Sequence, residues 1–272
     1  MITIGITTFN RQRILKFMSE SLYRSDLSIP HNIRVYDDCS TEYGEDELKK
    51  LFPTAASIRI NKANLKADEN ILEMYKDFLT TDDTHFFNAD SDLIFSRDWL
   101  KKGMEFFERT DGVLTFFNAN LHDSYKDVDD DLCLKITIGS AGTMFSRNRV
   151  KELVDHLNSQ KNNKSFDWQF SKFFIDNNIP IYCVKNSLVQ HIGYTGQNSH
   201  FYFDFGRNFD IESLGHGQII NNILESYIDE IGRLEKKRID DTFYHLKRFL
   251  IIIIKKVLPR RVYYSIRQKL KK

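Results

Sequence analysis

The sequence is poor in the residues that mark disulfide scaffolds, zinc-binding modules and low-complexity chains. Of its 272 residues only three are cysteines, four are prolines and 12 are glycines, and no internal repeat is present. Cys39, Cys133 and Cys183 are scattered and odd in number, which supports neither a disulfide framework nor a zinc site. We expect them to be small, buried or half-buried side chains of a globular domain.

Long hydrophobic runs are also lacking. The longest, Phe249–Ile254, is far shorter than the roughly 20 residues that a membrane-spanning helix needs. The segment from Met1 to Thr8 has no basic stretch followed by a long apolar run, so we expect a strand rather than a signal peptide, and a cytoplasmic protein. A hydrophobic content of 41% with 13% aromatic residues is enough for one substantial core.

Charge is distributed unevenly along the chain. The net charge is only +1, yet residues 233–272 contain 14 Lys or Arg and three Asp or Glu, which leaves the preceding body acidic. Together with the run Phe249–Ile254, the basic tail predicts an interfacial helix on the anionic inner face of the cell membrane. An oligomerisation helix, or a basic face that packs on the body, is the alternative. The acidic body would repel nucleic acid, so we expect no nucleic-acid partner.

Strands and helices alternate in the first third of the chain. We expect strands over residues 2–8, 32–36, 57–60 and 84–95, and helices over residues 11–23, 45–52 and 68–79. This alternation predicts βαβ units, which build an α/β fold with a mostly parallel sheet and helices on both faces. In such sheets ligands bind outside the carboxyl ends of the strands.

The second part is less regular. We expect strands over residues 112–118, 132–138 and 180–189, and helices over 149–157 and 167–177. Between them we expect a solvated acidic loop over 121–131, a glycine-rich turn at 139–142 and an ordered loop over 191–217.

The segment from Thr84 to Phe95 is an apolar strand that runs into two carboxylates, Asp90 and Asp92, separated by Ser91. At a strand end the backbone turns, so both carboxylates can converge on one cation. Mg²⁺ and Mn²⁺ prefer oxygen ligands and are commonly bound by one or two carboxylates together with a diphosphate. The pattern predicts a metal-assisted nucleotide-diphosphate site, with helix capping as the alternative role of such acidic pairs.

Two further polar clusters follow strand ends. Residues Thr7 to Arg11 offer backbone donors at a helix N-terminus and a guanidinium, both suited to a phosphate. Asp38 can accept a hydrogen bond from a nucleotide base while Asp37 caps or supports it, and a plain helix N-cap is the alternative for this pair. Because carboxyl ends of parallel strands share one edge, we expect these clusters to meet the two metal carboxylates in space.

The order of these motifs resembles that of the GT-A fold glycosyltransferases, most closely the family-2-like enzymes. The resemblance covers roughly residues 1–195. It rests on Thr7–Arg11, Val35–Ser40, Asn64–Asn70, Asn88–Asp92 and Phe166–Trp168. It implies a Rossmann-like GT-A fold and transfer of a sugar from a nucleotide donor, with a UDP-sugar as the expected donor, assisted by Mn²⁺ or Mg²⁺.

The resemblance also implies roles for single residues. It places His191 as a third metal ligand beside Asp90 and Asp92, whereas a lone histidine can also be a hydrogen-bonded core residue. In the segment Asn64–Asn70 the usual glycine and arginine of the family are replaced. The residues that the resemblance and the strand ends together assign to the donor are Thr7, Phe9, Asn10, Arg11, Asp38, Lys66, Asp68, Asp90 and Ser91.

Inverting transfer needs a carboxylate that takes the proton of the acceptor hydroxyl as this attacks the anomeric carbon. The resemblance assigns that work to Asp167, which opens an expected helix and precedes Trp168, an aromatic that can stack on a sugar. A helix N-cap is the alternative role of Asp167.

We therefore expect a catalytic domain over residues 1–217, with a nucleotide-binding part at about 1–95 and an acceptor part at about 96–217, followed by a helical basic tail over 218–272. The expected function is a metal-dependent, inverting glycosyltransferase that acts on a glycan or lipid-linked acceptor in bacterial surface polysaccharide synthesis. The alternative is a non-catalytic nucleotide- or sugar-binding protein of the same fold, because a fold does not guarantee its chemistry.

Overall fold

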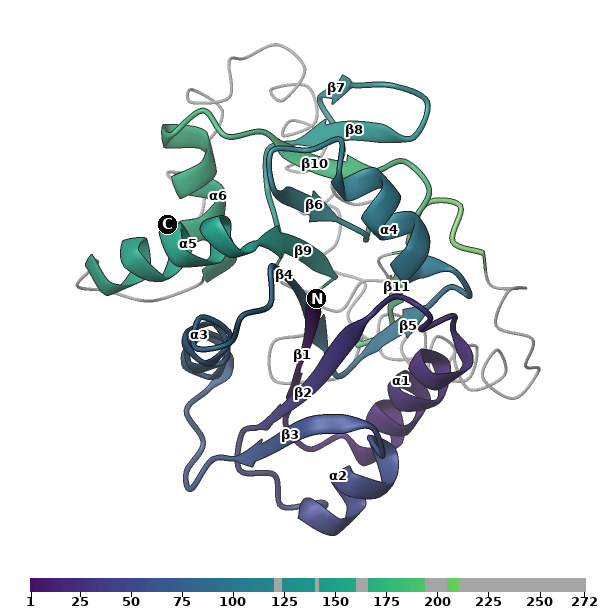
Figure 1. The fold of residues 1–272 in the computed structure, drawn as a ribbon, viewed down its shortest axis with the longest axis vertical. Helices are drawn as coiled ribbons and strands as arrows, with labels where there is room; N and C mark the ends of the chain where they lie inside the picture. Colours follow the sequence, from purple (N-terminus) through teal and green to yellow (C-terminus); the bar gives the residue numbers. More distant parts are fainter. Residues whose placement is uncertain (120–123, 140–141, 160–165, 194–204, 211–272) are drawn as a thin grey trace, which may run out of the picture.

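The computed structural model describes residues 1–119, 124–139, 142–159, 166–193 and 205–210. These residues form a nine-stranded sheet of order β3-β2-β1-β4-β9-β6-β10-β8-β7 and a two-stranded sheet of β11 and β5 (Figure 1). The strands are β1 (Ile2–Thr8), β2 (His31–Asp37), β3 (Ala55–Ile60), β4 (His85–Asp90), β5 (Leu93–Phe95), β6 (Val113–Thr115), β7 (Lys126–Asp127), β8 (Leu132–Lys135), β9 (Thr143–Ser146), β10 (Ile181–Val184) and β11 (Val189–His191). The helices are α1 (Gln12–Arg24), α2 (Glu45–Leu51), α3 (Ala67–Phe78), α4 (Trp99–Phe107), α5 (Arg147–Ser159) and α6 (Phe166–Asp176).

The predicted βαβ architecture is confirmed. β1 lies parallel to β2 on one side and to β4 on the other, and β3 continues the parallel set. In the large sheet only β9 and β8 run against the direction shared by the other described strands. Thr143–Ser146, for which the sequence pattern predicts no strand, directly follows the turn expected at residues 139–142 and forms β9 between β4 and β6. The acidic loop likewise contains β7, and α4 is a helix that the sequence pattern does not predict.

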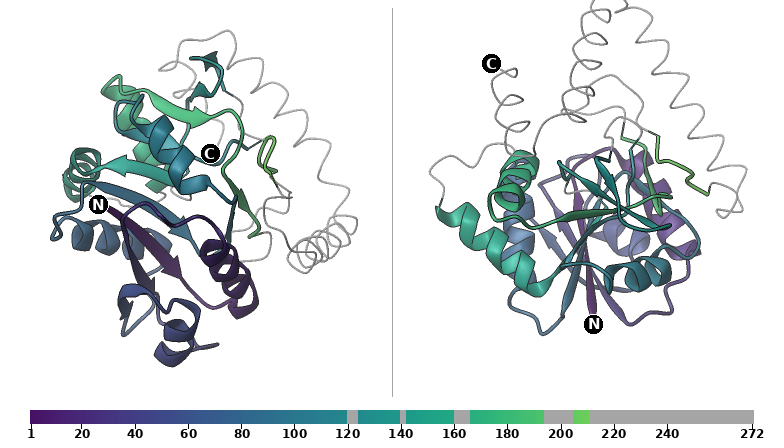
Figure 2. Two further views of the ribbon diagram at one scale, coloured as in Figure 1. Left: turned by 45° about the vertical axis from the view of Figure 1, so that its right-hand side comes forward. Right: turned by 90° about the horizontal axis from the view of Figure 1, so that it is seen from above.

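Helices cover both faces of the sheet. α1, α2 and α4 lie on one face, and α3, α5 and α6 lie on the other (Figures 1 and 2). Neighbouring residues of a strand point to opposite faces, so β4 contributes Phe87 to the first core and Phe86 to the second. Phe87 packs against Trp99, and Phe86 against Tyr75. Burial of one such large side chain contributes about 1.5–3 kcal/mol, so both faces are firmly anchored to β4.

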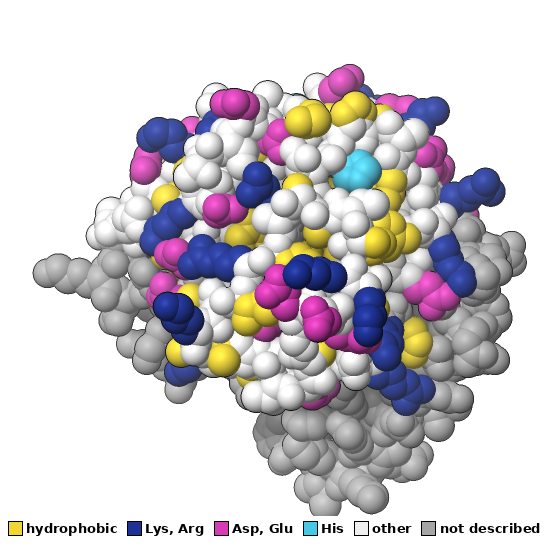
Figure 3. Space-filling model, turned by 60° about the horizontal axis from the view of Figure 1, so that its bottom comes forward, with side chains coloured by type: hydrophobic (Ala, Val, Ile, Leu, Met, Phe, Trp, Pro, Cys, Tyr) yellow, Lys and Arg dark blue, Asp and Glu magenta, His cyan; other side chains and the backbone are white. Residues whose placement is uncertain are grey.

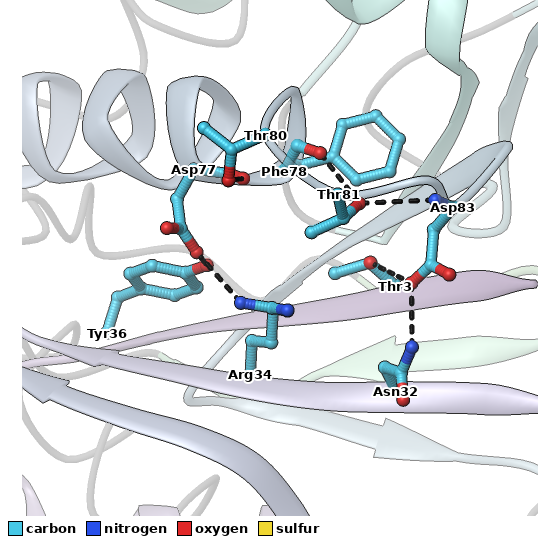
Figure 4. A network of polar contacts seen from close by, with 9 residues as sticks. All are labelled: Thr3, Asn32, Arg34, Tyr36, Asp77, Phe78, Thr80, Thr81 and Asp83. Atoms are coloured by element: carbon cyan, nitrogen blue, oxygen red, sulfur yellow. Dashed lines mark hydrogen bonds and ion pairs between the residues drawn. The ribbon is translucent and has the colours of Figure 1, made fainter.

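A polar network ties β1 and β2 to the end of α3 and the residues after it (Figure 4). Asp83 accepts hydrogen bonds from Thr3 Oγ1 at 2.7 Å and Asn32 Nδ2 at 2.9 Å. Asp77 pairs with Arg34, with Nη1 and Oδ2 3.2 Å apart, and also accepts from the Tyr36 hydroxyl. These contacts hold α3 in place along the sheet, and with it the turn that precedes the helix.

Several other expectations can be compared with the fold. Cys133 and Cys183 are buried and Cys39 is half-buried, as expected. None of the helices in the described residues has the length and apolarity needed to cross a membrane. The basic tail over 218–272 and most of the loop over 191–217 lie outside the described residues. On the face shown in Figure 3, acidic and basic side chains lie next to each other, so no field of one sign covers it.

The division into a nucleotide-binding part and an acceptor part near residue 95 stays a prediction. Strands from both parts belong to one continuous sheet, because β9 from the second part pairs directly with β4 from the first. The sheet therefore offers one shared edge to any ligand that reaches both parts.

Candidate active site

The ends of β1 and β4 place two of the predicted polar clusters side by side, the turn that begins at Thr7 and the carboxylates that begin at Asp90. Thr7 and Asp90 are register partners, and Thr7 Oγ1 donates a hydrogen bond to Asp90 Oδ1 at 3.3 Å. Asn88 Nδ2 donates to the same oxygen at 3.3 Å. Phe9 follows in the turn and is half-buried. The convergence predicted from the carboxyl ends of parallel strands is therefore present.

Arg11 links the first turn to the two carboxylates. Its Nη1 lies 2.8 Å from Asp92 Oδ2, and its Nη2 donates to Ser91 Oγ at 3.1 Å. Asn10 and Arg11 both have left-handed backbone conformations, with φ of 49° and 56°. Such conformations are unfavourable for residues other than glycine and concentrate at functional sites. Here they direct the guanidinium across the sheet edge onto Asp92.

His191 approaches Asp92 from the other side because β11 pairs with β5 and sets His191 opposite Leu93. Its Nε2 lies 3.3 Å from Asp92 Oδ1, and Ile192 N donates to the backbone oxygen of Asp92 at 2.8 Å. A Cβ at Gly193 would lie 1.9 Å from Asp92 Oδ2, so only glycine fits there. The sequence analysis did not single out Gly193, although a glycine two positions after His191, a candidate metal ligand, could have indicated a close approach of the backbone.

The two carboxylates differ in electrostatic surroundings. Loss of solvent, and then the neighbouring Asp92 carboxylate, raise the pKa of Asp90. Burial also acts to raise the pKa of Asp92, but His191 and Arg11 outweigh it and lower that pKa. Burial disfavours a charged His191, yet Asp92 raises its pKa. The site thus holds one firmly ionised carboxylate and a second whose ionisation is disfavoured until more positive charge enters.

The donor set suits a hard divalent cation. Within the described residues, no group of three or more His, Cys, Asp or Glu side chains is already placed to hold a metal ion. However, Asp92 Oδ1 is buried, and its polar contact within that same part of the chain is the ion pair with His191 Nε2 at 3.3 Å. A buried carboxylate oxygen beside a second carboxylate and an imidazole matches the oxygen and nitrogen ligands of Mg²⁺ and Mn²⁺. Asp90, Asp92 and His191 therefore fit the predicted metal chemistry.

The backbone donors of the first turn are partly used within the chain. Asn10 N donates to Ser40 Oγ at 2.8 Å, and Gln12 N donates to Glu42 Oε2 at 2.9 Å. Asp37 Oδ2 accepts from Ser40 N at 2.8 Å. These contacts fasten the turn after β1 to the loop after β2, and they leave the Arg11 guanidinium as the cationic group of this turn at the site.

Asp38 is buried, and both of its oxygens bind the turn before α3. Oδ1 accepts from Leu65 N at 2.7 Å and from Asn61 Nδ2 at 3.1 Å, while Oδ2 accepts from Lys66 N at 2.9 Å. The structure thus gives Asp38 a positioning role that the sequence did not show. The contact with a nucleotide base that the resemblance implied stays a prediction.

Lys66 has an exposed side chain and an unusual backbone, with φ of 72° and ψ of 162°. This region is essentially restricted to glycine. The Asp38 carboxylate holds Lys66 in this conformation, close to the end of β2 and hence to the candidate site.

Asp68 and Asp167 bring the starts of α3 and α6 together. Asp68 Oδ1 accepts from Phe166 N at 3.4 Å, so Asp68 serves helix packing, and its contact with a donor stays a prediction. Asp167 is exposed as the second residue of α6 rather than an N-cap before it. After burial and Asp92, the charge of Asp167 also acts to raise the pKa of Asp90.

A hollow of about 390 Å³, lined by His85, Gly112 and Ser146, lies away from these residues. His85 begins β4, whereas Asp90 ends it, so this hollow is at the opposite, amino edge of the sheet. Ligands of open α/β sheets bind at the carboxyl edge, and the cluster around Asp92 is therefore a better candidate than this hollow.

Solved structures that resemble this chain include several of one protein, S. aureus TarS. The crystal structure of S. aureus TarS 1-349 matches this chain with a TM-score of 0.51 and 12% sequence identity. The match covers 69% of this chain and 59% of the TarS chain. The same fragment in complex with UDP has a TM-score of 0.48 and 15% identity, covering 67% and 59%. For the fragment in complex with UDP-GlcNAc the TM-score is 0.48 and the identity is 12%, and the match covers 83% of this chain and 66% of that structure. This chain thus spans about three fifths of the first of these structures, and at such identity the likeness concerns the fold alone.

No curated protein matches the sequence. The sequence profile described as glycosyl transferase family 2 matches residues 3–161, which is more than half of the chain and contains β1 to β9 with Arg11, Asp90 and Asp92. The chain therefore belongs to glycosyl transferase family 2.

Proposed function

We propose that this protein is a metal-dependent, inverting glycosyltransferase that moves a sugar from a nucleotide-sugar donor to an acceptor hydroxyl. Family membership and the carboxyl-edge location support the reaction class. The observation that carries the proposal is the convergence of three separate chain segments, which bring Arg11, the pair Asp90 and Asp92, and His191 together. Positive groups near a departing diphosphate stabilise the charge that develops in the transition state.

The residues divide the work by chemistry. Asp90 and Asp92, with His191, would hold Mn²⁺ or Mg²⁺, which when bound offsets charge on the diphosphate leaving group. The Arg11 guanidinium orients Asp92 and can contact a phosphate oxygen. Asp167, exposed at the start of α6, takes the proton from the acceptor hydroxyl. Lys66, exposed beside the end of β2, is placed to contact the donor.

Donor, acceptor and location are finer parts of the proposal. We take UDP-sugars as the first donors to test and a glycan or lipid-linked hydroxyl as the acceptor, in the synthesis of a bacterial surface polysaccharide. The charge of the tail, with 14 basic residues between 233 and 272, supports attachment to the anionic inner face of the membrane.

The direct test is thermal stabilisation by a panel of nucleotide sugars with and without Mn²⁺, combined with product analysis. A ligand that binds only the native state stabilises it by about 2.7 kcal/mol at one hundred times its dissociation constant. We expect Mn²⁺-dependent stabilisation in the wild type, its loss together with turnover in Asp92→Asn, and wild-type behaviour in Asp155→Asn, which changes an exposed carboxylate on α5.

The outcomes separate the competing functions. Stabilisation without any turnover, including hydrolysis of the donor, would favour a non-catalytic binding protein of the same fold. Unchanged Mn²⁺ dependence in Asp92→Asn would remove Asp92 from the metal site.

A further inference from the structure

A second polar pocket, of about 300 Å³, lies at the same edge of the sheet as the candidate active site. Its lining includes Asn118, which follows β6, and Lys185 and Asn186, which follow β10. Both strands run in the direction of β4. The pocket therefore opens at the carboxyl edge, where the two metal carboxylates also lie, and its volume is within the range of small-ligand sites.

The pocket is separate from the active site but connected to it. Strand order places β9 and β6 between β4 and β10, so spacings of about 4.8 Å set the two sites roughly 10–15 Å apart. Lys185 and Asn186 belong to the segment that leads from β10 through Leu188 into β11, which carries His191. Leu188 N donates to Phe116 O at 2.9 Å and Ser96 N donates to Leu188 O at 3.0 Å, so the segment is fixed between the two sites.

The chemistry of the lining suits a neutral ligand with many hydroxyl groups. Asp127 and Asp130 are balanced by Lys185 and Arg207, and Lys185 Nζ lies 3.4 Å from Asp127 Oδ2. A site for phosphate or for a cation would present an excess of one sign. A sugar ring instead carries hydroxyls that both donate and accept, and a lining of amides and paired charges offers partners for both.

Asn118 provides an independent sign of a missing partner. Its side chain is only 4% exposed, and its Nδ2 donates to Lys185 O at 2.8 Å. Its Oδ1 is buried and accepts no hydrogen bond in the described part of the chain. Buried carbonyl oxygens are nearly always satisfied, because leaving one without a donor is unfavourable. A ligand hydroxyl in this pocket would supply the donor.

We propose that this pocket is an acceptor subsite that binds a neutral sugar unit distant from the hydroxyl that is glycosylated. The proposal rests on the proposed glycosyltransferase function, because it requires an acceptor that reaches both the transfer site and the carboxyl end of β10. It makes the acceptor an oligosaccharide rather than a single sugar. The pocket then selects acceptors by their length. The segment between β10 and His191 connects this pocket to the site where the sugar is transferred.

The test measures saccharide binding in the absence of nucleotide, with cellobiose, lactose and N,N′-diacetylchitobiose as probes in NMR titrations. We expect the wild type to bind at least one probe, and Lys185→Ala/Asn186→Ala to bind it at least about tenfold more weakly. Asn186→Trp, which fills the pocket from an exposed position, should have the same effect. Asn148→Ala, at the amino-edge hollow, is the matched control and should bind like the wild type.

Three results would overturn the proposal: no binding of any probe to the wild type, unchanged binding in both pocket variants, or loss of binding in Asp92→Asn alone. Thermal stabilisation of the same proteins by nucleotide sugars is measured in a separate experiment, and it should persist in the pocket variants. Saccharide binding by a wild type that binds no nucleotide sugar would count against the proposed function. Nucleotide-sugar binding without saccharide binding would count against the pocket.

Discussion

Replacing Lys66 with glycine should make the protein more stable, although it removes a side chain at the edge of the candidate site. Lys66 has φ of 72° and ψ of 162°, a conformation that glycine adopts readily and other residues do not. Residues held in such regions cost about 1–3 kcal/mol each. The conformation persists because Asp38 Oδ2 and Asn64 Oδ1 each accept from Lys66 N at 2.9 Å.

The expected gain follows from two opposing terms. Relief of strain contributes about 1–3 kcal/mol, and the greater freedom of glycine in the unfolded chain removes about 0.5–1 kcal/mol. The net increase in the free energy of unfolding is about 1 kcal/mol, which raises Tm by roughly 2–4 °C for a chain of this size. Thermal and urea unfolding followed by circular dichroism would measure it.

Lys66→Ala is the matched control, because alanine keeps the Cβ and hence the strain. Its stability should stay within about 0.5 kcal/mol of the wild type, since only exposed side-chain atoms are removed. A glycine variant no more stable than the alanine variant would refute the strain argument. Both variants should bind nucleotide sugars more weakly, and wild-type affinity in Lys66→Ala would show that the ammonium does not contact the donor.

Three further changes test the site and the tail. Asp167→Asn should keep donor affinity but lose at least roughly a hundredfold in turnover, and the opposite pattern in steady-state kinetics would place Asp167 in the nucleotide site. Gly193→Ala should displace the Asp92 carboxylate, because the added carbon would lie 1.9 Å from Oδ2. It should destabilise the fold by about 1–3 kcal/mol and abolish Mn²⁺-dependent nucleotide-sugar binding in calorimetry, and normal binding would contradict the close approach of Gly193 to Asp92. Deleting residues from Phe249 onward should release the protein from anionic vesicles in co-sedimentation while donor hydrolysis persists. Equal partitioning of both forms would exclude a membrane role for the tail.

Local pattern was sufficient for the first half of the fold. The buried runs that form β1, β2 and β4 alternate with amphipathic helices. Such a switch in hydrophobic periodicity, from that of strands to that of helices, predicts βαβ units. It was not sufficient for β9, because Thr143–Ser146 is a short apolar run after two glycines that reads equally well as part of a turn. Only its antiparallel pairing with β4 and β6 makes it a strand.

The candidate site shows the same limit at the level of single residues. Asp90 and Asp92 could be singled out because two carboxylates at the end of a buried strand suit a hard cation, although helix capping is also a common role of such pairs. The roles of Asp38 and Lys66 were not, because a hydrogen bond from a backbone amide and a positive φ leave no mark on residue type. The sequence suggested that Asp38 contacts a nucleotide base, and the structure shows its buried carboxylate accepting hydrogen bonds from the turn before α3.

By itself, then, the sequence determined the alternation of elements, the polar strand ends and the charge contrast between body and tail, since these depend on hydrophobic periodicity and side-chain chemistry along the chain. The tertiary structure decided which groups meet. Arg11 and His191 lie on opposite sides of Asp92 because β1, β5 and β11 are brought to one edge by pairings between distant segments. The polar pocket beside β10 likewise exists only once strands from the second half join the sheet. Such long-range pairings reflect the packing of the whole chain, and no local window of residues contains them.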